Sequence, residues 1–148
     1  MMKRLLLLLV AVSSAASLLA VDYTPKGWLT DVEAAQKISA QKKIPILVLI
    51  SGPEWCPPCR ALERTVINDR SFQSFVKANA VGLFINLPRG NTTRELKQTL
   101  QKFSFFQNQV PAYALVDSDL KVLTVPKNRS VFEFKKAIVE SAKMLRKK

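Results

Sequence analysis

Two cysteines, Cys56 and Cys59, are the residues of this chain whose type and spacing most directly predict chemistry. They are the only cysteines in the 148-residue sequence, and they lie three positions apart in the segment Trp55-Cys56-Pro57-Pro58-Cys59. In the first turn of a helix, side chains at this spacing share one face and come within disulfide reach after a small adjustment. The pair is therefore expected to open and close without rearranging the fold.

Three roles are open to such a pair. A structural disulfide closing so short a loop would restrict the unfolded chain by only about 2 kcal/mol in the loop-entropy account. Metal binding is a weaker reading, because the chain has no histidine and a structural zinc site needs four ligands. Redox exchange is the reading we favour, since the pair follows an apolar segment at a predicted helix start. We predict no metal and no cofactor, and we keep a secreted binding or Cu(I)-handling module without turnover as the alternative.

The N-terminus has the layout of a secretory signal peptide. Residues 1–4 are short and basic, residues 5–12 are an unbroken apolar run, and residues 13–20 are small, with cleavage expected after Ala16 or Ala20. The apolar run is shorter than the roughly 20 residues of a membrane span, although an uncleaved anchor is the alternative. The sequence therefore predicts a periplasmic or secreted protein, in a compartment where disulfides persist.

The rest of the chain, residues 21–148, has the length of one domain. The whole sequence carries a net charge of +12, and without Lys3 and Arg4 it has 21 basic against 11 acidic residues, a net charge of +10. This charge favours an acidic partner or an anionic surface. The basic residues are spread along the chain without a nucleic-acid motif, so we predict no nucleic-acid binding and a monomer.

Hydrophobic patterning and capping signals divide the domain into helices and strands. Capping boxes at residues 30–33, 92–95 and 130–133 predict three helix starts, at Thr30, Thr92 and Ser130. Two further helices and four strands follow from the apolar periodicity. These are helices at 58–68 and 71–78, and strands at 44–50, 81–87, 112–116 and 122–125.

This order predicts an α/β fold with a central mixed sheet flanked by helices. Strands separated by helices are expected to pair in parallel, and the terminal hairpin to form an antiparallel edge. The chain resembles the thioredoxin-like superfamily over about residues 28–145. The resemblance rests on the WCPPC motif after a buried strand, and on Val110-Pro111 before the next-to-last strand. It implies a thioredoxin fold. Residues 55–66 are similar to exported members, including the C-terminal periplasmic domain of DsbD.

The dithiol segment predicts a division of roles. Cys56 at the helix start is expected to be the nucleophile, because the helix dipole and unpaired N–H groups favour its thiolate. Cys59, one turn further, is expected to be more buried and to act as the resolving thiol. Pro57 and Pro58 fit a first turn, where N–H groups lack partners, and stiffen the loop. Trp55 is expected to flank the sulfur or to cover apolar residues.

The resemblance also implies a cis-proline at Pro111, beside the dithiol. In that geometry Pro111 would shape the wall facing Cys56 and expose the backbone of Val110 for pairing with an extended substrate strand. The alternative is an ordinary trans proline at the start of a strand. We therefore predict a substrate-binding surface made of Trp55, Pro57, Pro58, Val110 and Pro111.

Thioredoxins usually carry a buried aspartate in the strand before the dithiol, and this chain departs from that pattern. The candidate positions are all apolar: Val48, Leu49 and Ile50. Glu63 is four residues after Cys59, on the same helical face, and the DsbD-like domain has an acid at the matching place. Glu63 is therefore our candidate for the proton acceptor. The alternative is a surface salt bridge with Arg60 or Arg64.

The absence of histidine bears on the direction of electron flow. Strongly oxidising relatives place a histidine between the cysteines, where it stabilises the thiolate. A dithiol without that help favours the reduction of its partners. The sequence thus predicts an exported enzyme that reduces protein disulfides. Such an enzyme needs a membrane electron donor to regenerate its dithiol.

Overall fold

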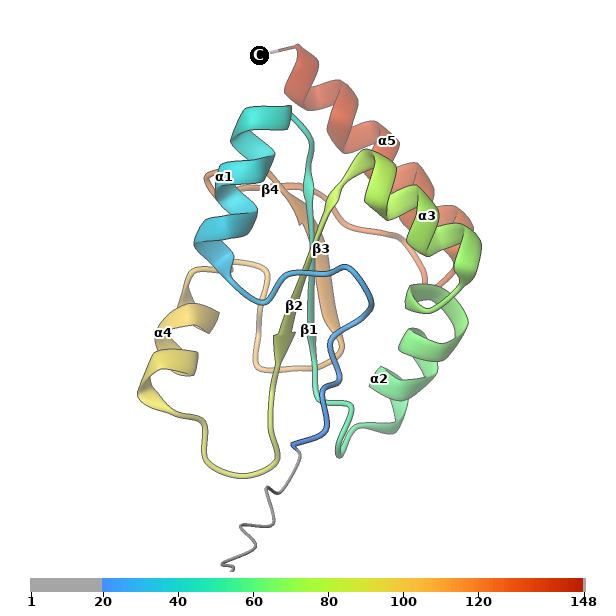
Figure 1. Cartoon of the computed structure of the whole chain (residues 1–148). Helices are drawn as coiled ribbons and strands as arrows, with labels where there is room; N and C mark the ends of the chain where they lie inside the picture. The colour runs from blue at the N-terminus through green and yellow to red at the C-terminus, as the bar shows by residue number, and fades with distance from the viewer. Residues whose placement is uncertain (1–19, 148) are drawn as a thin grey trace, which may run out of the picture.

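A four-stranded mixed sheet forms the centre of the protein. The computed structural model of the chain describes residues 20–147, so the predicted signal peptide lies outside the described residues except for Ala20. The sheet has the strand order β2-β1-β3-β4 (Figure 1). Its strands are β1 (Ile46–Ser51), β2 (Val81–Asn86), β3 (Ala112–Val116) and β4 (Val122–Thr124).

The strand directions confirm the mixed sheet and correct one pairing. β1 is parallel to β2, and β3 and β4 are antiparallel neighbours, as predicted. β3, however, lies antiparallel beside β1, although helices separate these strands in the sequence. The helix between β2 and β3, α4 (Arg94–Gln101), has eight residues and is only about 12 Å long. It is too short to carry the chain back to the end of the sheet where β2 starts. β3 therefore begins at the end of the sheet where β2 stops, and it runs in the opposite direction.

Helices cover both faces of the sheet (Figure 1). α1 (Val32–Lys42) and α4 lie on one face, and α2 (Pro57–Leu62), α3 (Arg70–Asn79) and α5 (Val131–Arg146) lie on the other. β1 is buried throughout and supplies both cores in alternation. Leu47 and Leu49 pack on the face of α3 and α5, whereas Ile46, Val48 and Ile50 pack on the face of α1 and α4. This two-sided burial confirms the predicted central strand.

The helix caps confirm one predicted start and shift two others by one residue. The Ser130 hydroxyl accepts the N–H of Glu133, as expected. The first helix is capped by Asp31 and not by Thr30, consistent with the higher rank of aspartate at this position. α4 is capped by Thr93 and not by Thr92. Two adjacent threonines offer the same hydroxyl, so the sequence alone did not distinguish them.

The helix that carries the dithiol has two parts. It begins at Pro57, one residue before the predicted start, and α2 continues as a π-helical segment, η1 (Glu63–Ile67). Single π turns occur within α-helices frequently at functional sites. Here the change of helical geometry begins at Glu63, the candidate proton acceptor.

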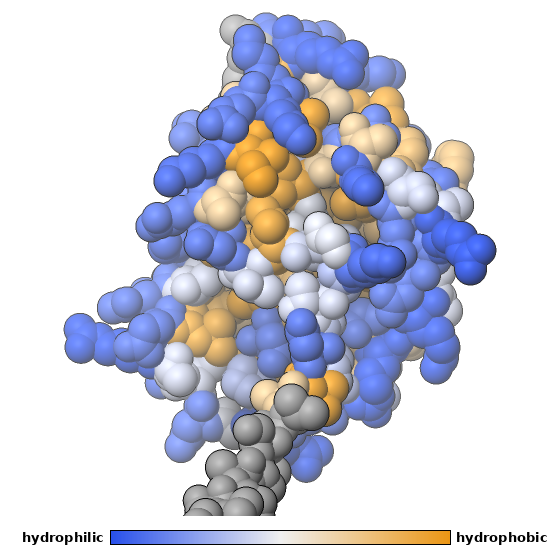
Figure 2. All heavy atoms as spheres, viewed as in Figure 1, coloured by the Kyte–Doolittle hydropathy of each residue, from blue (hydrophilic) through white to orange (hydrophobic). Residues whose placement is uncertain are grey.

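The surface is mainly hydrophilic on the face shown in Figure 2. Among the apolar groups visible there, one lies between α1 and α3 and another beside α4. Within residues 20–147, no helix combines the length and the apolar character needed to cross a membrane.

Candidate redox site

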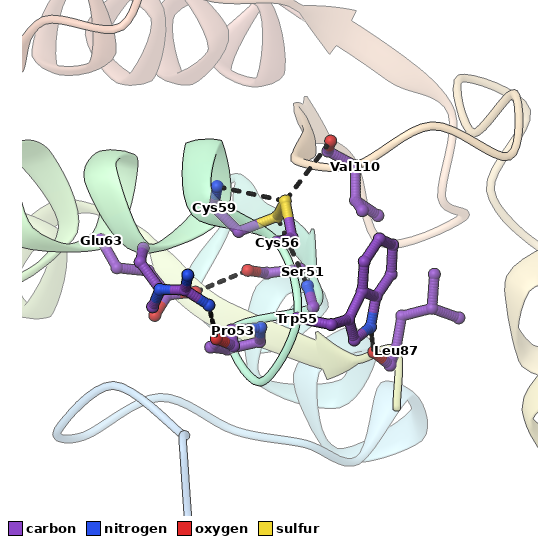
Figure 3. Close-up of a disulfide and its surroundings, with 10 residues drawn as sticks. Ser51, Pro53, Trp55, Cys56, Cys59, Glu63, Leu87 and Val110 are labelled. Atoms are coloured by element: carbon purple, nitrogen blue, oxygen red, sulfur yellow. Dashed lines mark hydrogen bonds between the residues drawn. A yellow bond between two sulfur atoms is a disulfide. The ribbon is translucent and has the colours of Figure 1, made fainter. Parts of the chain in front are cut away.

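Cys56 and Cys59 lie at the N-terminus of α2, joined by a disulfide with their Cα atoms 5.3 Å apart (Figure 3). A tight turn leads from the end of β1 into this helix. The carbonyl of Gly52 accepts the N–H groups of Trp55 and Cys56 at 3.1 and 2.8 Å. The buried strand thus ends directly beneath the sulfur atoms, and the structure shows the oxidised state of the pair.

Backbone N–H groups face both sulfur atoms. Cys56 caps α2, with its Sγ accepting the N–H of Cys59 at 3.2 Å. The Sγ of Cys59 accepts the N–H of Gly52 at 3.5 Å. Pro57 and Pro58 occupy the first two helical positions, where an N–H would lack a helical partner. In the reduced protein these donors would favour a thiolate at either position.

The two sulfur-bearing residues differ in access to solvent. Cys56 is 4 % exposed and Cys59 is fully buried, which is the order expected from their positions in the first turn. Pro57 and Pro58 are exposed beside them. A partner therefore reaches Cys56 before Cys59, which agrees with the predicted roles without testing them.

The Val110–Pro111 segment lies against the dithiol. Its peptide bond is cis, and the carbonyl oxygen of Val110 is 3.8 Å from Cys56 Sγ (Figure 3). The strand register explains this contact, because Ala112 pairs with Ile50, just before the turn that leads to Cys56. Val110 and Pro111 are half-buried. The segment is thus placed where a partner of Cys56 would lie, and its role in substrate binding remains a prediction.

Glu63 faces the end of β1. Its carboxylate accepts the hydroxyl hydrogen of Ser51 at 2.5 Å (Figure 3). Partial burial raises the pKa of Glu63 above its ordinary value, although the Ser51 hydrogen bond and the charge of Arg60 oppose that rise. Arg60 itself donates to the carbonyl of Pro53 at 2.8 Å. Glu63 is therefore a half-buried carboxylate that is bonded to Ser51 and feels the charge of Arg60.

Ser51 and Gly52 connect Glu63 to the buried sulfur. Ser51 binds the Glu63 carboxylate, and the next residue, Gly52, donates its N–H to Cys59 Sγ. Both contacts start from one dipeptide at the end of β1, so the carboxylate and the Cys59 sulfur lie in the same neighbourhood. The role of Glu63 as the acceptor of the Cys59 proton stays a prediction, and this neighbourhood is compatible with it.

Trp55 is held in a fixed orientation next to the motif. Its Nε1–H donates to the carbonyl of Leu87 at 2.8 Å, and its ring lies against Gly52. A Cβ atom added at Gly52 would lie 2.6 Å from the indole, so only glycine leaves room for the ring. The half-buried tryptophan both flanks the dithiol and covers the turn.

Three residues of the site did not emerge from the sequence: Ser51, Gly52 and Leu87. Ser51 did leave a signal, because it is a polar residue directly after the apolar run that precedes the motif. Gly52 and Leu87 act through backbone groups, which any residue type carries. Their involvement depends on the turn geometry and on the register of β1 against β2.

The site offers few ligands for a metal. Among residues 20–147, no group of three or more histidine, cysteine or carboxylate side chains is placed to hold one ion. The geometry of the two cysteines supports the making and breaking of the Cys56–Cys59 bond.

Comparison with known families agrees with the fold. A family profile described as thioredoxin-like matches residues 27–118, more than half of the chain. The chain belongs to this thioredoxin-like family. The match includes the dithiol and Val110–Pro111, and it ends just after β3.

Solved structures support the same thioredoxin-like fold. One is described as DsbH oxidoreductase, with a TM-score of 0.61 and 22 % identity, covering 80 % of this chain and 85 % of that one. Another is a disulphide isomerase from Xylella fastidiosa Temecula1, with a TM-score of 0.50 and 22 % identity, covering 86 % and 94 %. A search of curated proteins found no match. The narrower similarity to the DsbD domain remains a prediction.

Proposed function

We propose that this thioredoxin-like protein is an exported thiol–disulfide oxidoreductase that reduces disulfides in other proteins. The observation that carries the proposal is the placement of the Cys56–Cys59 pair. It caps the start of α2, and Cys56 Sγ is 3.8 Å from the carbonyl of Val110. Helix N–H groups on one side would favour a thiolate, and the backbone of Val110 on the other could pair with a docked substrate strand.

The reaction proceeds by two exchanges. The Cys56 thiolate attacks one sulfur of a substrate disulfide, forming a mixed disulfide and releasing the other substrate sulfur as a thiolate. Cys59 then loses its proton to Glu63 and attacks Cys56 Sγ. The Cys56–Cys59 disulfide forms, and the second substrate sulfur leaves and is protonated. Two electrons have moved to the substrate, and an outside donor must return two to the enzyme.

The reducing direction and the exported location are parts of the same proposal. The chain has no histidine, and the residues between its cysteines are prolines, so the site lacks the side chain that would stabilise the dithiol form. The N-terminal layout supports export. An oxidising compartment would draw the pair towards the disulfide. We therefore place an electron donor at the membrane.

The division of labour between the cysteines can be tested by trapping. Reduced Cys59→Ser is mixed with an excess of a small disulfide-bonded peptide, and adducts are measured by intact mass. Without a resolving thiol, this variant should accumulate an adduct of one peptide through Cys56. The matched variant Cys56→Ser should form at least about tenfold less adduct, because its remaining thiol, Cys59, is fully buried.

Two results would contradict the proposal. Equal adducts from both variants would show that Cys56 is not the preferred nucleophile. If neither variant formed an adduct, the result would favour a binding module whose cysteine pair does not turn over.

A further inference from the structure

A cleft of about 930 Å³ opens beside Trp55, on the α4 side of the dithiol. It lies between the segment after β2 and the segment that leads from α4 towards Val110. Its apolar lining includes three aromatic residues, Trp55, Phe103 and Phe106, together with Leu100. Apolar residues beside α4 are visible at the surface in Figure 2.

The cleft is continuous with the redox site through Trp55. This residue directly precedes Cys56, and its indole is held by the carbonyl of Leu87, another lining residue. A polypeptide whose disulfide reaches Cys56 would therefore place its flanking residues in or over the cleft. The volume accommodates side chains of a few consecutive residues of such a segment.

The charge of the lining has one sign. Arg89 and Lys97 are lining residues, both exposed, and no carboxylate is among the residues that line the cleft. Glu54 approaches from outside, where its carboxylate accepts the backbone N–H of Arg89 at 3.5 Å. That contact uses the backbone and not the guanidinium. A lining that combines apolar residues with two cations is complementary to a segment that combines an apolar and an acidic side chain.

We propose that this cleft selects the substrate, and that Arg89 and Lys97 favour disulfides flanked by an acidic residue and an apolar one. This inference rests on the proposed reductase activity and names the substrate class of the same site. Its occupant is an extended, acidic peptide segment of the substrate protein. Exposed ion pairs contribute modestly, so two of them correspond to a preference of about three- to tenfold.

The test uses three peptides with one internal disulfide and one phenylalanine. They differ only in two flanking residues, which are Glu-Glu, Gln-Gln or Lys-Lys. The rate constant for oxidation of the fully reduced enzyme is measured in single turnovers, by acid quenching and mass spectrometry. At roughly 20 mM salt the Glu-Glu peptide should react about three to ten times faster than Gln-Gln. The advantage should shrink at about 0.5 M salt, where the ions screen the charges.

Two double variants separate the cleft from the overall charge. Arg89→Gln/Lys97→Gln should abolish the preference for the acidic peptide. Lys136→Gln/Lys143→Gln removes the same charge from exposed positions of α5, on the other side of the sheet, and should leave it intact. Both pairs are exposed, so folding should be preserved.

The possible results are distinct. Equal rates for the three peptides would overturn the charge selection and leave the reductase activity standing. If both double variants lost the preference equally, its cause would be the net charge and not the cleft, and the inference would also be overturned. Failure of the enzyme to oxidise with any of the peptides would contradict the proposed function itself, and this inference with it.

Discussion

Glu63 is the residue whose chemistry most depends on where the fold places it. It is half-buried on the helix that carries Cys59, and it is bonded to Ser51 at the end of β1. Burial raises its pKa, whereas the Ser51 hydrogen bond and the charge of Arg60 oppose the rise. A carboxylate whose pKa is moved towards neutrality is a better match to a thiol proton than an ordinary glutamate.

Glu63→Gln should slow the release of mixed disulfides while leaving the first attack by Cys56 mostly intact. The variant retains a side-chain oxygen for Ser51 but loses the base. We expect resolution to slow by about a hundredfold near neutral pH, at the lower end of general base effects. The difference should narrow at high pH, where hydroxide removes the thiol proton, and at low pH, where Glu63 is itself protonated. Single-turnover kinetics of each step measure this.

Glu54→Gln is the matched control for that variant. Glu54 lies two residues before Cys56 and is exposed. Its substitution should leave the resolution rate unchanged. A resolution rate in Glu63→Gln equal to that of the native chain from pH 6 to 8 would make Glu63 a structural residue.

The same residue predicts a pH dependence of stability. A carboxyl whose pKa is higher in the folded than in the unfolded state binds its proton more tightly when folded. The protonated carboxyl therefore contributes its full stabilisation of the folded state at low pH. This stabilisation is lost as the pH rises from about 4.5 through the folded-state pKa. Glu63→Gln should thus gain in free energy of unfolding relative to the native chain as the pH rises from 4 to 7.

Urea unfolding of the two oxidised proteins at several pH values checks this expectation. The difference between the two free energies of unfolding should change across that interval in favour of the variant. A difference that is constant with pH would show that the carboxyl is not desolvated in solution.

At the scale of elements, the turn between β1 and α2 sets the geometry of the site. Gly52 contributes three functions there: its carbonyl closes the turn, its N–H faces Cys59, and its missing Cβ leaves space for Trp55. Gly82 on β2 plays a similar part under Trp28, whose ring an added Cβ would meet at 2.4 Å. The rings of Trp55 and Trp28 thus each pack against the backbone of a glycine.

Gly52→Ala should displace the Trp55 indole and weaken its hydrogen bond to Leu87. Overpacking of this kind costs about 1–3 kcal/mol, measured as the free energy of unfolding in urea. In a Trp55→Ala background the same substitution should cost much less, because the ring is absent. If the two costs are equal, the clash with the indole is not the cause.

The elements were predictable where one signal dominates. β1 and β2 are apolar runs buried on both faces, and Ser130 is a strong cap with an acidic residue in the first turn. The cysteine pair was likewise identifiable, since its residue type and spacing are tied to its chemistry, whereas the role of Glu63 stays a prediction. The antiparallel placement of β3 was not, because it follows from the short reach of α4 and not from the local pattern of β3.

Other parts of the site depend on tertiary register. The contact of Val110 with Cys56 requires Ala112 to pair with Ile50, and the bond from Trp55 to Leu87 requires β2 to lie beside β1. The π-helical segment from Glu63 also has no distinct signature in the sequence. Backbone partners and helix irregularities of this kind are set by packing and not by residue type.

At the scale of the whole molecule, the proposed choice of partners depends on charge and on redox direction. In the proposed exported protein, the net charge of +10, from 21 basic and 11 acidic residues, would favour acidic partners over distances comparable to the Debye length, about 8–10 Å at physiological salt. The cleft beside Trp55 would then act at contact range, through Arg89 and Lys97. In this proposal, long-range attraction and local selection would favour the same class of substrate.

The most direct test of the account is the reduction potential of the Cys56–Cys59 pair, measured by equilibration of the purified protein with glutathione buffers. The dithiol should be reducing, nearer to thioredoxin at about −270 mV than to the oxidase DsbA at about −120 mV. The reasons are the absence of histidine and the Pro57-Pro58 pair between the cysteines. A midpoint above about −160 mV would contradict the reductase and identify an oxidase.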